Sequence, residues 1–374
     1  MPESWRRPAW FATACALLYL GGCGGGADPS SVTAVVAPLH AAQAGADPGV
    51  TWNLAIAAPR IWHSLSMNPA GDVIVAGEAG GPLHVSSDGG STWTTGNSSN
   101  AMWISSAMTA SGDHLFAVQY EGDLVDSTDH GQTWRAVASS PLVYSPSGLG
   151  FQSVAVSQDG QRIAAVIQNG SIVFSSDGGV TWRAGVLPDG PQNRWWRSID
   201  STPDGEVLVA VSHNGEIYRS TDAANSWRAV SVTVAGSSTP VIEHWYRVKL
   251  SADGLTVAVV ANSVGGGPGT GIYVSRDGGA TWAKGYSQVA DYTFLVMTAD
   301  GQVIAASVSD TKGKTGRVLL STDQGANFEP VSMPATDTNW RAIAMSPNAD
   351  RVAAATGSFH TETTGLLYTG QRLR

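Results

Sequence analysis

A repeated pair of residues constrains the fold of this chain more than any other feature of its sequence. Seven times, an aromatic residue stands nine positions before a turn residue, which is Gly in six cases and Ala in one. The pairs are Trp62/Gly71, Trp103/Gly112, Phe151/Gly160, Trp196/Gly205, Trp245/Gly254, Tyr292/Gly301 and Trp340/Ala349. Successive pairs lie 41 to 49 residues apart, a period typical of propellers and solenoids. The sequence therefore predicts seven copies of one structural unit.

A second motif recurs in step with the first. Four clean copies lie at 86–93, 127–134, 175–182 and 275–282, and two eroded copies begin at 220 and 321. Their aspartates are Asp88, Asp129, Asp177, Asp222, Asp277 and Asp323. The pattern Ser-x-Asp-x-Gly-x-Thr-Trp resembles the Asp-box, or BNR, repeat.

The residue types of this motif predict a structural role. A short Asp side chain can accept hydrogen bonds from backbone N–H groups a few residues further on, which closes a turn. Gly supplies the positive φ that such a turn needs, and Trp buries apolar surface beneath it. Calcium binding or hydrolysis by these carboxylates is the alternative, but a catalytic group is not needed six times in one chain. We therefore expect hairpin staples, with no metal and no cofactor.

Each repeat is predicted to contain four strands. In the fourth repeat, turn residues separate segments at 196–201, 206–212, 216–220 and 227–232. The second segment contains the continuous apolar run Val-Leu-Val-Ala-Val, which suits a strand buried on both faces. Units of four strands and about 40 to 50 residues are typical of propeller blades. No segment has the pattern of an amphipathic helix.

The last repeat lacks a fourth strand. Its segments at 340–346, 351–356 and 366–369 are followed by the end of the sequence. Near the front, Gly-Val-Thr-Trp at 49–52 matches the end of the Asp box at 179–182, without a blade before it. We expect 51–56 to supply the missing strand and to leave the ring without a free edge. The predicted fold is an all-β, seven-bladed β-propeller of four-stranded blades, closed by the N-terminal strand.

The first residues have the pattern of a bacterial lipoprotein signal. Arg6 and Arg7 precede an apolar stretch at 9–20 that is too short to span a bilayer. The Leu-Gly-Gly-Cys segment that ends at Cys23 resembles the lipobox, whose cysteine becomes N-terminal and lipid-modified. An ordinary secretory signal with a chance cysteine is the alternative. Cys15 lies in the apolar stretch, so lipidation would account for the single thiol left in the mature chain.

These features divide the chain into three parts. We expect a signal peptide at 1–22, a lipidated cysteine and flexible Gly/Ala/Pro-rich tether at 23–48, and the propeller at 49–374. The membrane would be contacted through the lipid anchor only. Because Gly24 is not acidic, anchoring to the outer membrane of the bacterial envelope is favoured over the inner membrane.

The loops that lead into each first strand share one face of a propeller with the loops between the second and third strands. Loops on a rigid scaffold commonly carry function. Candidate binding residues on this face are His63, Trp195, Arg197, Glu243, Arg247 and Arg341. Arginines gathered at one mouth can bind carboxylates or phosphates through two parallel hydrogen bonds. The alternative is that they form ion pairs with Asp200, Glu243 or Asp291 between blades, and that Trp195 packs in the core.

Charge and motifs narrow the classes of function. The net charge is −9 with 14% charged residues, which argues against a nucleic-acid binder. The repeats resemble those of the photosystem II assembly factors of the Ycf48 type, which are non-catalytic propellers, and more distantly those of sortilin-type receptors, xyloglucanases and sialidases. The sialidase arginine triad and the length of the two-propeller xyloglucanases are not matched.

The resemblance to the assembly factors implies a non-catalytic protein-binding or complex-assembly module with an envelope protein as its partner. In those factors an Arg patch contacts the client, a part that Arg197, Arg247 and Arg341 could play here. The alternative is a surface glycoside hydrolase that uses Glu243, or a glycan-binding lipoprotein.

Overall fold

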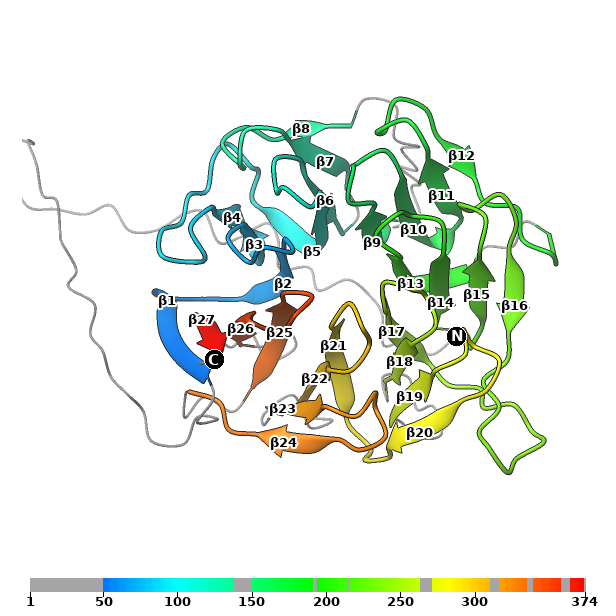
Figure 1. Cartoon of the computed structure of the whole chain (residues 1–374). Helices are drawn as coiled ribbons and strands as arrows, with labels where there is room; N and C mark the ends of the chain where they lie inside the picture. The colour runs from blue at the N-terminus through cyan, green and yellow to red at the C-terminus, as the bar shows by residue number, and fades with distance from the viewer. Residues whose placement is uncertain are drawn as a thin grey trace, which may run out of the picture. The chain divides into compact units, whose positions relative to one another are not determined.

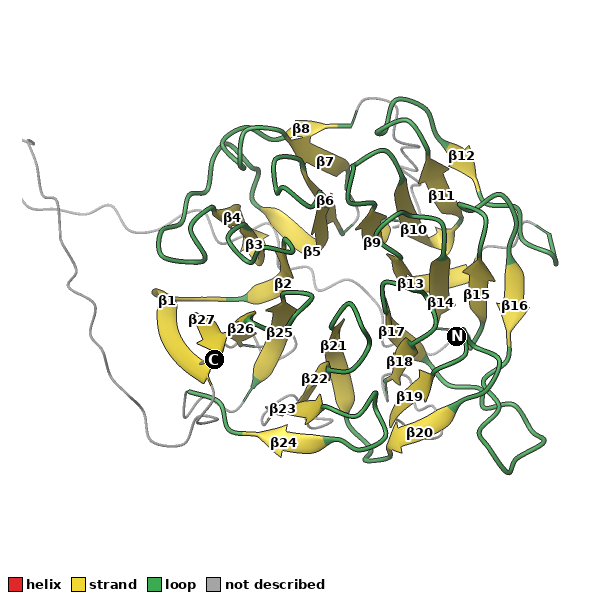
Figure 2. Ribbon diagram, viewed as in Figure 1, coloured by secondary structure: helices red, strands yellow, loops and turns green. Residues whose placement is uncertain are grey.

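The computed structural model describes residues 50–120, 122–137, 150–190, 194–213, 215–262, 271–309, 316–334, 339–357 and 364–372. Contacts separate Met1–Ala41 from a second unit, Ala42–Arg374, which contains all of these residues. In these ranges every regular element is a strand (Figure 2). No helix that is long and apolar enough to cross a membrane occurs in the same ranges. The predicted signal peptide, Cys23 and the tether lie outside the described residues.

The strands form successive antiparallel blades around one axis (Figure 1). The innermost strands are β2 (Trp62–Met67), β5 (Ala101–Met108), β9 (Phe151–Val156), β13 (Arg194–Ser201), β17 (Trp245–Leu250), β21 (Asp291–Met297) and β25 (Trp340–Met345). The second strands are β3 (Ile74–Gly81), β6 (Leu115–Gln119), β10 (Ile163–Gly170), β14 (Leu208–Ser212), β18 (Val257–Ala261), β22 (Ile304–Ser309) and β26 (Arg351–Thr356).

The outer half of each blade completes the pattern. The third strands are β4 (Leu83–Ser86), β7 (Leu124–Ser127), β11 (Ile172–Ser175), β15 (Ile217–Ser220), β19 (Gly271–Ser275), β23 (Gly316–Ser321) and β27 (Gly365–Arg372). The fourth strands are β8 (Arg135–Ala136), β12 (Arg183–Ala184), β16 (Arg228–Val230), β20 (Ala283–Tyr286), β24 (Glu329–Val331) and β1 (Val50–Arg60). In the first blade this place is taken by a single bridge between Val85 and Thr94. The described strands are thus consistent with the seven blades that the repeats predict. Pairing of β3 with β5 and of β10 with β13 joins the first blade to the second and the third to the fourth.

The predicted closure of the ring is confirmed. Strand β1 pairs antiparallel with β27, from Val50 opposite Arg372 to Arg60 opposite Gly365. The strand runs four residues past the predicted end at Ile56, because pairing resumes after two register shifts. Trp62 and Leu65 of the first blade also pack with Ala342 and Ala344 of the last. Both a strand ladder and an apolar interface therefore join the two ends of the propeller.

Strand limits in the fourth repeat differ slightly from the expected ones. β13 begins at Arg194, two residues before the aromatic position, because Arg194 and Trp195 pair with Gly170 and Gln168 of the preceding blade. The second strand starts at Leu208 and the fourth ends at Val230, so both are shorter than predicted. Tertiary pairing sets these limits, which local sequence patterns do not encode.

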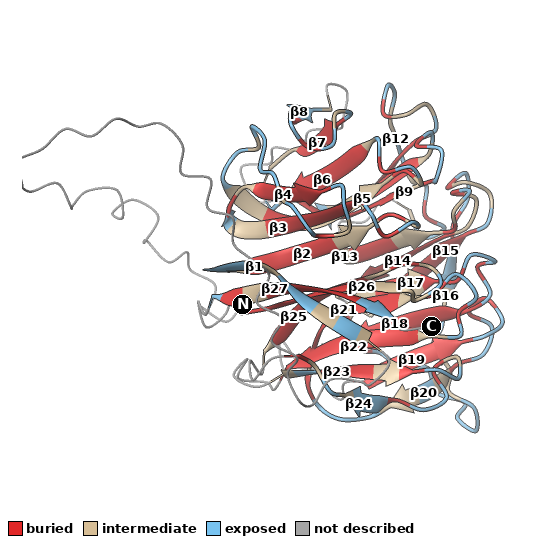
Figure 3. Cartoon of the chain, turned by 60° about the vertical axis from the view of Figure 1, so that its left-hand side comes forward, coloured by how far each residue is buried: buried red, intermediate tan, exposed pale blue. Residues whose placement is uncertain are grey.

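The core lies between adjacent blades. The second and third strands are almost entirely buried, while the rim is exposed (Figure 3). Trp62, Trp103, Trp196 and Trp245 are each at most 1% exposed and fill the spaces between blades. Burying an aromatic side chain removes about 150–250 Å² from water, so these residues dominate the packing energy. The repeated aromatic position is thus the main apolar anchor of each blade.

The Asp boxes form local hydrogen-bonded hairpins. In the third blade, Ser175 Oγ donates to Asp177 Oδ1 at 2.8 Å, and the backbone N–H and Oγ of Thr181 donate to the two carboxylate oxygens at 2.8 and 2.6 Å. Asp88, Asp129, Asp222 and Asp277 accept the same set of bonds in their hairpins, and for Asp323 the amide of Asn327 replaces the hydroxyl donor. These aspartates therefore direct their carboxylates at their own turns.

Substitution of one of these aspartates should change the acid sensitivity of the fold. Hydrogen bonds from the hydroxyl and backbone N–H of Thr181 lower the pKa of Asp177 to about 2. A carboxylate whose pKa is lower in the folded state stabilises the protein above its unfolded pKa of about 4, and this stability is lost as the pH falls towards 2. Thermal melts from pH 5 to pH 2 should therefore show a weaker pH dependence for Asp177→Asn than for the unaltered chain. An equal pH dependence of the melting midpoint in the two proteins would contradict the stabilising role of the Asp177 carboxylate.

The turns between first and second strands lie on the same face as the Asp boxes. Gly178 N donates to Gln161 O at 2.9 Å, which joins the box of the third blade to its own first turn. Neighbouring turns are linked by backbone bonds from Gln158 N to Pro203 O, 2.7 Å, and from Ala299 N to Pro347 O, 2.8 Å. We call this side the turn face and the opposite side, where the inner strands begin, the loop face.

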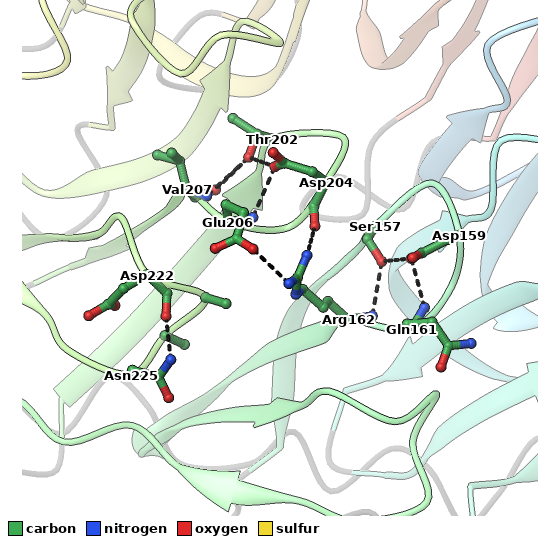
Figure 4. A network of polar contacts seen from close by, with 12 residues as sticks. Ser157, Asp159, Gln161, Arg162, Thr202, Asp204, Glu206, Val207, Asp222 and Asn225 are labelled. Atoms are coloured by element: carbon green, nitrogen blue, oxygen red, sulfur yellow. Dashed lines mark hydrogen bonds and ion pairs between the residues drawn. The ribbon is translucent and has the colours of Figure 1, made fainter.

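Polar side chains reinforce the turn face (Figure 4). Ser157 Oγ donates to Asp159 Oδ1 at 2.5 Å, and Thr202 Oγ1 donates to Asp204 Oδ1 at 2.6 Å. Arg162 bridges the two blades, because its guanidinium donates to Asp204 O and forms an ion pair with Glu206. The turn face is thus fixed by contacts within and between blades.

Serines on the inner strands cap the backbone of the next blade. Ser105 Oγ accepts from Val154 N at 3.3 Å, and Ser198 Oγ accepts from Val248 N at 3.4 Å. Ser153 Oγ instead donates to Ile199 O, 3.3 Å away. Beyond the first residues of β5 and β13, which pair with the preceding blade, the inner edge of the strands has no partner strand, and these hydroxyls satisfy part of it. The small residues at this position therefore also form hydrogen bonds.

Candidate functional site

A backbone irregularity marks the start of every inner strand. In each blade the pairing register shifts around the residue that directly follows the repeated aromatic residue. A residue left out of the ladder in this way forms a β-bulge, which re-aims its side chain. These residues, which we call the axial ring, are His63, Ile104, Gln152, Arg197, Tyr246, Thr293 and Arg341.

Contacts run from blade to blade along much of the axial ring. Arg197 Nη1 donates to Gln152 Oε1 at 3.4 Å, and its Cζ lies 4.7 Å from the centroid of the Tyr246 ring. Thr293 Oγ1 donates to Arg341 O at 2.9 Å. Arg341 Nη2 lies 3.3 Å from His63 Nε2, and because a guanidinium only donates, this nitrogen of His63 accepts the bond. Members from six blades are thereby brought into contact, directly or through Arg247.

Arg247 follows Tyr246 and completes the basic group. Its Cζ lies 4.9 Å from the Tyr246 centroid and 4.9 Å from the Phe294 centroid, and its Nε donates to Thr293 O at 3.2 Å. Arg197 and Arg247 thus both stack on Tyr246. We refer to Arg197, Arg247 and Arg341 as the arginine cluster.

The arginine cluster perturbs the ionisation of the groups within it. Burial, and less strongly the charge of Asp291, raise the pKa of Tyr246, but the charges of Arg197, Arg247 and Arg341 outweigh them and lower it to about 8. Burial, together with Arg197 and Arg341, lowers the pKa of Arg247 to about 10 despite the favourable effect of Tyr246. At neutral pH Arg247 remains charged, so the cluster concentrates positive charge beside a phenol.

No carboxylate among the described residues forms an ion pair with the arginine cluster. Asp200 instead binds Lys249 Nζ at 2.8 Å and accepts from Leu250 N at 2.9 Å. The Nε atom of Arg341, a residue only 5% exposed, is buried without a hydrogen-bond partner within the described ranges. Asp200 and Glu243 therefore have partners other than these arginines, and the alternative is wrong for both. The charge of Asp291 acts on Tyr246, but within the described ranges no ion pair joins Asp291 to the three arginines.

Glu243 and Trp195 lie apart from this cluster in their contacts. Glu243 is 4% exposed, accepts a hydrogen bond from Tyr273 Oη at 3.1 Å, and has its pKa raised by burial. Trp195 meets the ring of His213 edge-on at 5.0 Å, and His213 lies 4.1 Å from His244. Burial, then His244 and Arg197, lower the pKa of His213 to about 4. Of the predicted site residues, His63 and the three arginines come together, whereas Glu243 and Trp195 form other contacts.

The sequence interpretation missed Gln152 and Phe294, and it considered Tyr246 only as a ring beside Trp245 that could be available for stacking. The usable signal was the position directly after the repeated aromatic residue, which holds His63, Arg197 and Arg341 in three blades and Gln152 and Tyr246 in two others. Among the described residues no group of three or more His, Cys, Asp or Glu side chains is placed to hold a metal ion. Cys23 lies outside the described residues.

Comparison with known proteins defines the class as a β-propeller. Residues 67–333 match the family model of the DUF6242 beta propeller domain, and the chain belongs to this family. Similar solved structures include "YCF48 bound to D1 peptide", at 15% identity and a TM-score of 0.59, over 88% of this chain and 96% of that one. YCF48 from Cyanidioschyzon merolae gives 13% identity and a TM-score of 0.58, over 85% and 98%. These matches confirm the likeness in fold to Ycf48-type propellers. No curated protein matches the sequence.

Proposed function

We propose that this chain is a non-catalytic propeller that binds a protein partner through the arginine cluster, tethered to the bacterial envelope by lipid on Cys23. The observation that carries the proposal is a group of three arginines beside Tyr246 with no ion-paired carboxylate among the described residues. A guanidinium group without an ion-paired carboxylate is stabilised when a partner's carboxylate binds it, because charge-assisted hydrogen bonds are about twice as strong as neutral ones. The partner surface is therefore expected to be acidic.

Two further points support this function. A propeller of the same fold has been solved as YCF48 bound to D1 peptide, so the architecture is compatible with peptide binding. Fold alone does not define function, so the class of ligand is inferred from the side chains of the arginine cluster. The Leu-Gly-Gly-Cys sequence at 20–23 supports an anchor that keeps the propeller near envelope proteins, with the outer membrane favoured by Gly24.

The geometry gives less support to a glycoside hydrolase. Its candidate acid, Glu243, is buried and bound to Tyr273 within the fifth blade. The charged groups that act on it are Lys284 and His244, and no second carboxylate is among them. Glycoside hydrolysis commonly needs two carboxyl groups about 5 to 10 Å apart across the scissile bond. The protein-binding function therefore accounts for more of the described site.

A charge-matched pair of triple variants tests the proposed function. The full-length chain would be cross-linked in native envelope and recovered, beside Arg197/Arg247/Arg341→Ala and a control, Arg135/Arg276/Arg372→Ala, on exposed positions. Each lost charge-assisted bond costs about 1.5 to 3 kcal/mol, so partner recovery should fall at least about tenfold in the cluster variant alone. Arg197→Glu provides a single variant if the triple one does not fold. Equal recovery with both triple variants, or recovery of polysaccharide without protein, would refute the proposal.

A further inference from the structure

The inner strands enclose a cavity of about 450 Å³ that is separate from the arginine cluster except at Arg247. All seven inner strands contribute to its wall, as their arrangement about the axis in Figure 1 allows. Its lining reaches the turn face at Gln158, Pro203, Ala252, Ala299 and Pro347, while Arg197, Arg341 and His63 do not take part. The volume is within the range of about 300 to 1,000 Å³ that is usual for small-molecule sites.

The seven repeats differ at one position of this wall. Two residues after the repeated aromatic, five blades carry small residues, namely Ser64, Ser105, Ser153, Ser198 and Ala342. The fifth and sixth blades instead carry Arg247 and Phe294, which stack on one another and both line the cavity. Because five blades fold with a small residue at this position, the fold does not need the large side chains of Arg247 and Phe294 there. It gives the cavity one cationic and aromatic side.

Most of the polar groups in the wall already have protein partners. Ser66 Oγ and Ser106 Oγ lie 2.7 Å apart, and Lys249 is paired with Asp200 at 2.8 Å. Ser105, Ser153 and Ser198 bond to the backbone of the next blade. Two wall residues differ within the described part of the chain: Ser64 Oγ is buried without a hydrogen-bond partner, and of the guanidinium nitrogens of Arg247 only Nε has one. The Nη groups of Arg247 are therefore the donors most available to a ligand.

Apolar side chains form a belt towards the turn face. Five residues after the repeated aromatic, the wall carries Met67, Val156, Leu250, Met297 and Met345, and in the fourth blade the polar Ser201. Methionines adapt to ligands of irregular shape because their side chains are flexible and polarisable. A molecule that enters from the turn face would pass this apolar belt before it reaches Arg247.

We infer that this cavity binds a small organic acid with an apolar body. The carboxylate of the acid lies at Arg247 and Phe294, and its body packs against the apolar belt. The half-buried guanidinium of Arg247 supports this ligand class, since burial and the neighbouring arginines disfavour its charged form. An incoming carboxylate would relieve that cost. This site goes beyond the proposed protein-binding function and is entered from the opposite face.

Calorimetric titration of the full-length chain with decanoate, below its micellar concentration, tests the inference. Decanoate should bind with one site per chain, while acetate, which lacks the apolar body, and 1-decanol, which lacks the charge, should bind at least about tenfold more weakly. Arg247→Ser introduces the residue found in four other blades and should weaken decanoate binding by about tenfold or more. Arg197→Ser removes the same charge from the same Tyr246 ring but not from the cavity wall, and should weaken decanoate binding clearly less than Arg247→Ser does.

Three results would overturn the inference: no binding of decanoate, equal affinity for 1-decanol, or equal loss in the two serine variants. The last would place the acid in the arginine cluster instead of the cavity. If Arg247→Ser does not fold, Met345→Glu and Met345→Lys provide a charge-paired test, with weaker binding expected for Glu alone. Protein-partner recovery with Arg197→Glu is measured separately, so failure of the cavity site is distinguishable from failure of the proposed function.

Discussion

Deletion of residues 50–60 should abolish cooperative folding of the propeller. This segment is β1, the outer strand of the last blade, and its loss would expose the whole edge of β27. Ala55 and Ile56 also pack on the apolar cluster that joins the first and last blades. An unpaired strand edge and an open ring together remove the contacts that fix the two ends. Thermal unfolding followed by circular dichroism measures the effect directly.

The control for this deletion is removal of residues 24–41. These residues belong to the unit separated from the propeller, so their loss should leave the melting midpoint unchanged. Addition of a peptide with the sequence of residues 50–60 should restore part of the cooperative transition to the truncated chain. A chain without residues 50–60 that melts like the intact protein would contradict the closure.

Trp245→Ala should be the most destabilising single substitution among those considered. The side chain is fully buried, its Nε1 donates to Gly215 O at 3.0 Å, and its ring meets Tyr273 edge-on at 5.3 Å. Truncation of a buried Trp costs about 3 to 5 kcal/mol, through lost apolar contacts and the cavity left behind. For a domain of this size the melting midpoint should fall by roughly 10 °C.

Trp93→Ala is the matched comparison for Trp245→Ala. Trp93 belongs to an Asp box, is only half-buried, and donates from Nε1 to Gly90 O at 3.0 Å. Its truncation should cost clearly less, about 1 to 2 kcal/mol, because much of the ring is already in contact with water. Urea titration of both variants gives the two free energies of unfolding. Equal losses would contradict the assignment of the repeated aromatic position as the main anchor.

Much of this fold could be predicted because each blade repeats the same local chemistry. The aromatic-to-turn spacing, the Asp boxes and the Asp-box ending at 49–52 were sufficient for the fold class and for the closing strand. Local patterns do not define where pairing stops, however. The extension of β1 to Arg60 depends on register shifts opposite β27, and the early start of β13 depends on contacts with the preceding blade.

The candidate site was predicted only in part. His63, Arg197 and Arg341 share one repeat position, so their meeting could be anticipated from the alignment of the repeats. The β-bulge that re-aims this position, and with it the role of Tyr246, depends on pairing with the second strand. Glu243 was misplaced because it lies in a loop, and its fold-back onto Tyr273 is a tertiary contact without a sequence signal.

The central claim is that the arginine cluster on the loop face receives the protein partner. Its most direct test places a photo-reactive benzoylphenylalanine at Tyr246, and for comparison at Leu255, which is 50% exposed on the turn face. After irradiation in native envelope, the Tyr246 position should form one dominant cross-linked protein whose yield falls with added salt, whereas the Leu255 position should not. Cross-linking of the same protein from Leu255 but not from Tyr246 would contradict the account.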